Sequence, residues 1–174
     1  MEHRRRYSMK PRDTQRSKVY AAEKVLFGSS KKFESVKDVE KYLRRIFDTV
    51  WFKKTFPHKR KFQVKDGRGR SGPSGAPRGA DGVTMSLPKW SRFESMILHE
   101  LAHGLTPREY AWHGPEFCAV FLRLVERFMG AEAHKALMFS FRDHNVRSIW
   151  FKPEINDVNE LLGLPPAKQE LFKF

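Results

Sequence analysis

Residues 99–117 read HELAHGLTPREYAWHGPEF, and the fold has to be built around the chemistry of this stretch. Its first five residues form an HExxH pattern, with histidines at His99 and His103 and a carboxylate at Glu100. In a helix, residues four apart lie one turn apart on the same face, so both imidazoles can reach one ion at about 2.0–2.1 Å. The glutamate of such a pattern contacts the water on the metal rather than the metal itself. The spacing therefore predicts a zinc-binding helix with Glu100 as the general base.

A catalytic zinc site needs a third protein ligand, and the residues alone do not decide which side chain supplies it. His113 lies ten residues after His103, where the next helix is expected to begin. Glu116 and Glu126 on that helix are the rival ligands. Three protein ligands leave the fourth position to water, which is the catalytic arrangement. The alternative to any metal site is a helix that simply carries two surface histidines and a glutamate.

The segment before residue 99 predicts a small antiparallel hairpin. Ser91 and Glu94 have the spacing of a capping box for the metal-binding helix. Residues 83–87 and the alternating stretch around residues 62–64 are typical of short strands, and the Gly/Ser/Pro-rich residues 68–82 form a long loop between them. In zinc peptidases a strand in this place pairs with the substrate backbone, so the candidate substrate-binding residues are Val83, Thr84, Met85, Ser86 and Leu87. The alternative is an ordinary core strand.

Helices are predicted on both sides of this segment. Residues 14–27 follow Asp13 or Thr14 as the N-cap, and a second helix follows Ser35 and ends before Pro57. Two more are expected, one after His113 that ends at Gly130 and one over residues 131–141. The fold class is thus α+β, with N-terminal helices, a small sheet and a helical C-terminal half. The length predicts one domain over residues 12–164, a basic flexible tail over 1–11 and a C-terminal tail over 165–174.

Composition limits the compartment and the partners. Cys118 is the only cysteine, which excludes an internal disulfide and a cysteine-rich zinc site, and its place on an apolar helix predicts a buried, inert thiol. No long apolar run is present, and the basic N-terminus is not followed by an apolar segment, so we expect no membrane association and a cytoplasmic location. The net charge of +14 favours polyanionic partners. Cations interleaved with aromatic residues make up the candidate nucleic-acid-binding set: Lys53, Lys54, Lys59, Arg60, Lys61, Lys65, Arg68 and Arg70. A solvated charged face over core aromatics is the alternative.

The quoted stretch resembles the active-site segment of SprT-like zinc metallopeptidases, the group that includes Spartan. The matching residues are His99, Glu100, His103, His113, Gly114 and Phe117. The resemblance implies a zincin-like minimal metallopeptidase with His113 as the third ligand, and proteolysis as the activity. Several members act on proteins crosslinked to DNA. Such proteins often carry a cysteine-bound zinc ribbon after the protease core, which this chain cannot form.

Residues 12–23, read with HELAH and HGPEF, are more closely similar to a small family of metallohydrolases from actinobacteria and their phages, whose substrate is open. A phage origin would place the protein in the host cytoplasm. The sequence thus predicts a zinc-dependent hydrolase with one zinc ion per chain and a protein or peptide substrate. Two alternatives stay open, a hydrolase of a non-peptide amide and a basic nucleic-acid-binding protein with a structural or inactive zinc site. Four residues are candidates for stabilising an oxyanion, and nothing in their spacing selects among them: Tyr110, His134, Arg142 and His144.

Overall fold

The computed structural model describes residues 12–67 and 82–149. The predicted tails and the cations Arg68 and Arg70 lie outside these ranges. The helices are α1 (Arg16–Ala22), the 3-10 helix η1 (Glu23–Leu26), α2 (Val36–Asp48), α3 (Val50–Thr55), the 3-10 helix η2 (Lys89–Ser91), α4 (Glu94–Leu105), α5 (Pro115–Phe128) and α6 (Ala131–Asp143), and the strands are β1 (Lys61–Lys65) and β2 (Gly82–Ser86). The α+β class is confirmed. Within the described residues, no helix combines the length and the apolar character needed to cross a bilayer.

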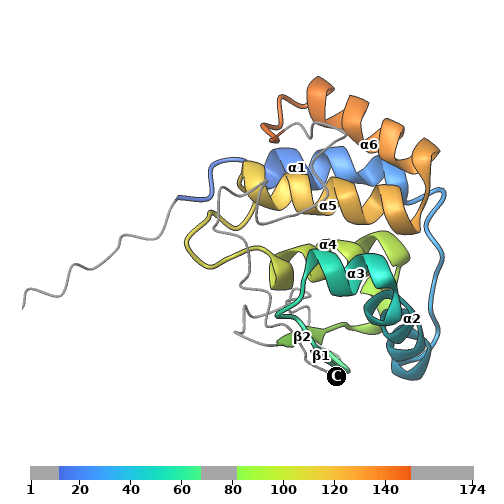
Figure 1. The fold of residues 1–174 in the computed structure, drawn as a ribbon. Coiled ribbons are helices and arrows are strands. Elements are labelled where there is room, and N and C mark those ends of the chain that lie inside the picture. Colours follow the sequence, from blue (N-terminus) through green and yellow to red (C-terminus); the bar gives the residue numbers. More distant parts are fainter. Residues whose placement is uncertain (1–11, 68–81, 150–174) are drawn as a thin grey trace, which may run out of the picture.

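Helix α4 lies at the centre of the fold. It contacts β2 on one side and α5 on another. Helix α6 packs against α1, η1 and α5, on the side of these elements that faces away from α4 (Figure 1). Every residue from Ile97 to Leu105 is buried. Buried side chains are held in fixed positions, because close-packed surroundings leave few alternative rotamers. The HExxH pattern thus lies on the buried part of this helix.

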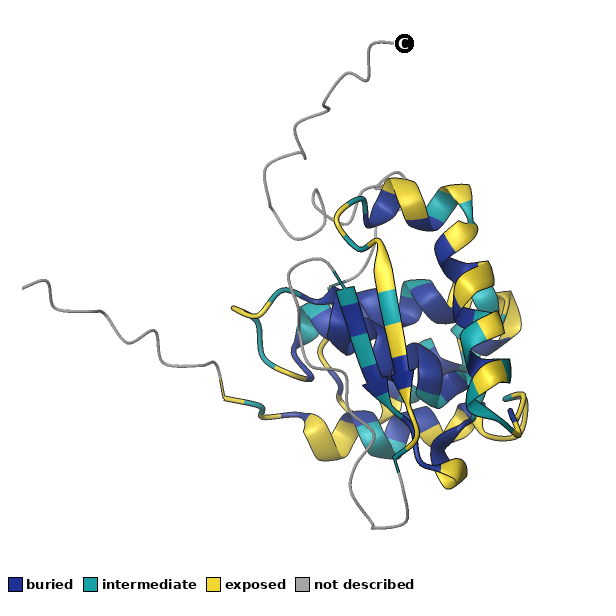
Figure 2. Cartoon of the chain, turned by 90° about the horizontal axis from the view of Figure 1, so that it is seen from below, coloured by how far each residue is buried: buried dark blue, intermediate teal, exposed yellow. Residues whose placement is uncertain are grey.

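The two strands are parallel, so the predicted antiparallel hairpin is wrong. Lys61 pairs with Gly82 and Lys65 with Ser86, in one continuous register. Alternation of apolar and polar residues fixes which face of a strand is buried, but it says nothing about strand direction. Strand β1 spans only about 16 Å, so a connection over residues 66–81 is long enough for β2 to start beside the first residue of β1. The outer face of β1 is exposed, whereas Val83 and Met85 of β2 face the core (Figure 2).

The predicted cap of α4 is also wrong, because the caps come from another part of the chain. Helix α4 begins at Glu94 and has no side-chain cap of its own. The Ser30 hydroxyl accepts a hydrogen bond from the Ser95 amide at 2.9 Å, and the Lys31 carbonyl accepts one from the Glu94 amide at 2.8 Å. Ser91 instead donates its hydroxyl to Pro88 O at 3.0 Å. The segment after η1 therefore satisfies the amino end of α4, which sequence spacing cannot show.

The N-terminal helices differ in their limits from the prediction. Helix α1 begins at Arg16, and neither Asp13 nor Thr14 caps it. Ser35 caps α2 as predicted, since its hydroxyl accepts from the Asp38 amide at 3.2 Å. The second predicted helix is broken at Thr49, whose side chain caps α3 by accepting from the Phe52 amide at 3.1 Å. The helices over residues 115–128 and 131–143 agree with the prediction, and Gly130 between them has a φ of 94° that favours glycine.

Close approach between α4 and β2 depends on Gly104. A Cβ on this residue would come within 2.8 Å of Val83 Cγ2 and closer still to Cγ1. We expect Gly104→Ala to lower the free energy of unfolding by about 1–2 kcal/mol, since overpacking costs more than the helix propensity of alanine returns. Urea denaturation followed by circular dichroism measures the change. In the double variant, Val83→Ala should restore part of the free energy of unfolding that Gly104→Ala removes, as expected for residues in contact.

The matched control is Gly28→Ala, because nothing lies within 4 Å of a Cβ at Gly28. Its free energy of unfolding should stay within about 0.5 kcal/mol of the wild type. Equal effects of the two substitutions would contradict the tight packing inferred at Gly104.

Candidate metal centre

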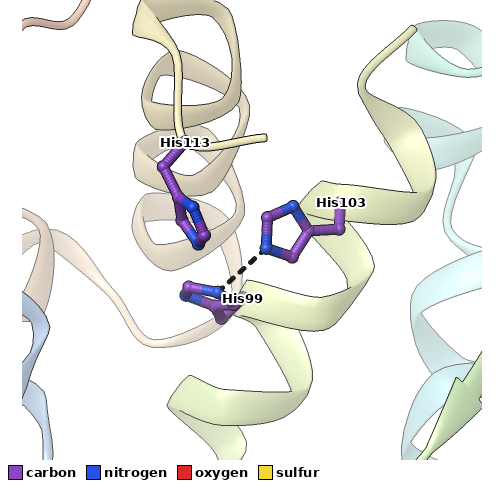
Figure 3. Close-up of side chains that lie close together, drawn as sticks. All are labelled: His99, His103 and His113. Carbon is purple, nitrogen blue, oxygen red and sulfur yellow. Dashed lines mark hydrogen bonds between the residues drawn. The ribbon is translucent and has the colours of Figure 1, made fainter. Parts of the chain in front are cut away.

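Three histidines meet at the junction of α4 and α5. His99 and His103 lie one turn apart on α4, and His113 comes just before α5, whose first residue is Pro115 (Figure 3). The imidazoles point toward one another, and all three residues are buried, with at most 5% of their surface exposed. One ring nitrogen from each lies within 4.8 Å of the others. Two turns of one helix and the start of the next thus supply three nitrogen donors at one point.

The spacing of these nitrogens fits a single metal ion. His99 Nε2 and His103 Nε2 are 3.1 Å apart. Two nitrogens on one tetrahedral zinc ion, each at 2.0–2.1 Å, would be separated by about 3.3 Å. His113 Nε2 is buried and has no hydrogen-bond partner among the described residues. A buried nitrogen without a partner is costly unless something binds it, so the donor set fits a metal ion.

Two carboxylates from the N-terminal segment orient the histidines. Glu23 Oε2 lies 2.6 Å from His99 Nδ1, and Asp13 Oδ2 lies 2.7 Å from His113 Nδ1. Each carboxylate accepts the Nδ1 proton, which leaves the Nε2 lone pair of that ring for a metal. Metal-binding histidines commonly have such partners, because they fix the tautomer and increase the basicity of the ligand. Glu23 is itself buried, on the face of η1 that meets α4.

Gln15 fixes the backbone at the third histidine. Its side-chain nitrogen donates to His113 O at 2.7 Å and to Arg147 O at 2.9 Å, and its oxygen accepts from the Arg147 amide at 2.9 Å. Gln15 is buried, so these bonds lie in a region of low dielectric, where they are strong. The residues just before α1 therefore hold both the side chain and the backbone of His113.

Aromatic rings enclose the imidazoles. Phe117, one turn into α5, has its ring centroid 4.3 Å from that of His103, 5.0 Å from His99 and 5.1 Å from His113. Tyr20 of α1 contacts His99 and His113 at centroid distances of 5.6 and 5.0 Å. These contacts restrict rotation of the imidazole rings. The phenylalanine of the HGPEF segment thus has a structural role in the site.

The same surroundings shift the pKa values of the histidines in opposite directions. Burial alone would lower the pKa of His99, but the charge and hydrogen bond of Glu23, with the charge of Glu100, outweigh it and raise the pKa. Burial lowers the pKa of His113, and the hydrogen bond to Asp13 only partly offsets this effect. A low pKa favours the neutral imidazole that binds metals.

The glutamates that the sequence offers as general base or as third ligand lie in different parts of the structure. Glu100 is buried beside His99, and both line a pocket next to the three histidines. Neither rival third ligand belongs to the group of converging donors. Glu126 accepts a hydrogen bond from Arg123 on the surface of α5 at 2.9 Å. Among the described residues the structure thus brings together His99, His103 and His113, with Glu100 alongside.

The other candidate residues are placed apart from the histidines. Val83, Met85 and Leu87 are buried, and β2 pairs only with β1 within the described residues. Substrate pairing with β2 stays a prediction. Nucleic-acid binding by the cations of α3 and β1 also stays a prediction, although Phe52 and Phe56 between them are buried and their rings pack at 5.1 Å in the core. Those two rings are therefore not placed for stacking on bases.

Two of the four oxyanion candidates lie on the surface. Arg142 and His144 are exposed at the end of α6, where they bond with Asp143 and Ser140. Cys118 is buried as predicted, and burial raises the pKa of its thiol far above the usual value, which keeps it protonated and unreactive.

Sequence reasoning missed Asp13, Gln15, Tyr20 and Glu23. A signal was present for two of them. Val19, Ala22 and Leu26 form the buried stripe of the first helical segment, and Gln15 and Glu23 occupy positions in the same stripe. Polar residues at core positions have to be satisfied by a partner elsewhere, so they mark a buried polar site.

Comparison of the chain with protein-family models, with curated proteins and with solved structures finds no match.

Removal of the supporting carboxylates should weaken metal binding without removing a ligand. We expect Glu23→Gln and Asp13→Asn each to reduce zinc affinity about 10- to 100-fold, because their histidines lose the partners that orient them. Competition with a chromophoric chelator measures the zinc affinity. His113→Ala, which removes a ligand, shows how far the affinity falls when the site is disrupted. Glu132→Gln on the surface of α6 is the matched control, since this side chain is 91% exposed. Unchanged affinity in both carboxylate variants, with the fold intact by circular dichroism, would show that they do not support the site.

Proposed function

We propose that this protein is a zinc-dependent metallopeptidase. The observation that carries the proposal is the buried group of three histidines, two of them oriented by carboxylates, with Glu100 beside them at a pocket. Three imidazole donors with room for one further ligand are typical of catalytic rather than structural zinc sites. A structural site would have no use for a glutamate in this place. The resemblance of residues 99–117 to SprT-like peptidases supports the same activity.

Zinc held by His99, His103 and His113 would act as a Lewis acid that lowers the pKa of water to about 7. Glu100 would accept a proton from that water as the water oxygen attacks the carbonyl carbon of the substrate. Glu100 would then give the proton to the nitrogen of the leaving amine as the C–N bond breaks. One water is consumed, and a carboxylic acid and an amine are formed. Burial of Glu100 keeps bulk water away from the proton it carries.

Tyr20 is our candidate donor of a hydrogen bond to the negative charge that develops on the carbonyl oxygen. Its ring contacts His99 and His113, and it lines the same pocket as Glu100. Burial raises the pKa of Tyr20, Arg16 opposes the shift, and the charges of Glu100 and Glu23 add to it. Tyr20 therefore keeps its proton at neutral pH and can donate it in a hydrogen bond to an oxyanion.

Glu100→Gln separates metal binding from catalysis. The amide has the size of the carboxylate but cannot take a proton, so we expect zinc content to stay unchanged and hydrolysis of a protein substrate such as casein to fall at least about 100-fold. Zinc content is measured by mass spectrometry and hydrolysis by release of labelled peptides. Glu116→Gln, on the first turn of α5, is the control and should retain activity. Wild-type rates in Glu100→Gln would show that the general base is another group.

Tyr20→Phe tests the oxyanion donor. The ring and its contacts remain, so KM and zinc content should change little, whereas kcat should fall roughly 10- to 100-fold. Steady-state kinetics on a quenched fluorescent peptide gives both constants. A loss of the same size in kcat/KM, caused by a higher KM with kcat unchanged, would mean that the hydroxyl contributes to substrate binding instead. Tyr42→Phe is the control, because Tyr42 lies on α2 and packs against Phe33.

A further inference from the structure

The pocket beside the metal centre is a groove between two helical segments. Its volume is about 630 Å³. One wall is formed by α1, η1 and the residue that follows them, and the other by η2 and the first two turns of α4. Phe93, Met96 and Glu100 recur at helical spacing along one wall, and Arg16, Tyr20 and Glu23 do so along the other. Each wall is thus a single helix face.

Two contacts show how the two walls of the groove run relative to each other. At one end Glu23 bonds to His99 at 2.6 Å, and beyond the other end the hydroxyls of Ser30 and Ser95 lie 3.0 Å apart. The two walls therefore run antiparallel, with Tyr20, His99 and Glu100 at the metal end. Phe27, Trp90 and Phe93 lie at the distal end. From Phe93 to Glu100 the helix rises about 10 Å, which is the length available to a bound group.

The distal end is apolar and open to solvent. Trp90 is 58% exposed and Phe27 is 47% exposed, although both line the groove. Aromatic side chains that border a cavity while facing water leave apolar surface uncovered, and such surface commonly marks a binding site. The groove is also continuous with the metal centre, because His99 and Glu100 belong to both. A group bound at the distal end would therefore be part of a molecule that passes the metal.

The charges on the walls indicate what accompanies the apolar group. Both carboxylates, Glu23 and Glu100, lie at the metal end, and Glu23 is bonded to His99. The wall formed by α1 and η1 carries two exposed cations, Arg16 and Lys24. The guanidinium carbon of Arg16 lies 5.4 Å from the ring centroid of Tyr20. Lys24, one turn before Phe27, favours a negatively charged group next to the apolar one, and Arg16, one turn before Tyr20, favours another at the metal end.

We propose that the groove selects the substrate, by receiving a large apolar side chain of a polypeptide whose neighbouring residues are acidic. This inference rests on the proposed peptidase function, whose site it extends. The apolar side chain lies between Phe27, Trp90 and Met96, and the acidic neighbours face Arg16 and Lys24. The peptide bond near this residue is then held at Glu100, so the groove decides where the chain is cut. Peptides with a small or cationic residue in this position bind weakly.

A binding experiment tests the groove without relying on turnover. The full chain carrying Glu100→Gln is titrated into fluorescein-labelled six-residue peptides that hold phenylalanine, leucine, alanine or lysine between two aspartates, and binding is read by fluorescence anisotropy. Phenylalanine and leucine should bind at least about tenfold more tightly than alanine, because a buried large side chain replaces a methyl group. Lysine should bind most weakly.

Added substitutions locate the binding site. Trp90→Ala and Phe27→Ala should remove most of the preference for phenylalanine, whereas Phe139→Ala should not, since Phe139 is 49% exposed but lies on α6. Lys24→Glu should weaken binding of the acidic peptides, and Lys37→Glu on α2 should not. The side chains replaced in addition to Glu100 are all exposed, so the variants are expected to fold, and circular dichroism checks this.

Equal affinity for the four peptides, no binding at all, or the same loss in Phe139→Ala as in Trp90→Ala would overturn the groove assignment. These outcomes are distinct from failure of the proposed function. If casein is cut by the wild type and not by Glu100→Gln, but the peptides show no preference, the peptidase stands and the groove proposal falls. If the peptides bind selectively but nothing is hydrolysed, the groove stands as a binding site and the peptidase assignment falls.

Discussion

The hydrogen bond between Glu23 and His99 is the interaction on which the arrangement of the molecule depends. It joins the N-terminal helical segment to the central helix α4, and both residues are buried. Placing a carboxylate and an imidazole in the interior costs desolvation energy that one hydrogen bond seldom recovers in full. A chain optimised only for stability would place two apolar side chains here. The polar pair is therefore evidence that the position of the His99 ring matters more than the stability lost.

This hydrogen bond is one of several through which the N-terminal segment supports the histidines. Asp13, Gln15, Tyr20 and Glu23 all contact the histidines or the backbone that carries them. All four lie within residues 12–23, so one short segment completes the site rather than a separate module. Because the same segment forms one wall of the groove, the element that orients the ligands also shapes the space for a substrate.

Local patterns predicted the parts of the structure that depend on local geometry. The four-residue spacing of His99 and His103 was enough to place two donors on one helix face, and Ser35 and Gly130 mark real helix boundaries. The convergence of His113 on them was predicted through the resemblance and a turn of suitable length. The patterns failed where the deciding partner is distant in sequence. Strand direction, the capping of α4 by Ser30 and the pairing of Glu23 with His99 are all of this kind.

The buried charges give a physical reason for the site to attract a cation. Glu23, Asp13 and Glu100 lie around three imidazoles that are neutral in their metal-binding form. Without a metal, protonation of a histidine would offset part of this negative potential. Burial lowers the pKa of His99, but the charge and hydrogen bond of Glu23 outweigh it and raise the pKa. A divalent ion at the Nε2 atoms would replace that proton and compensate the carboxylates at the same time. Its binding free energy would then be part of the free energy of folding, so the polar interior that weakens the metal-free protein would stabilise the metal-bound one.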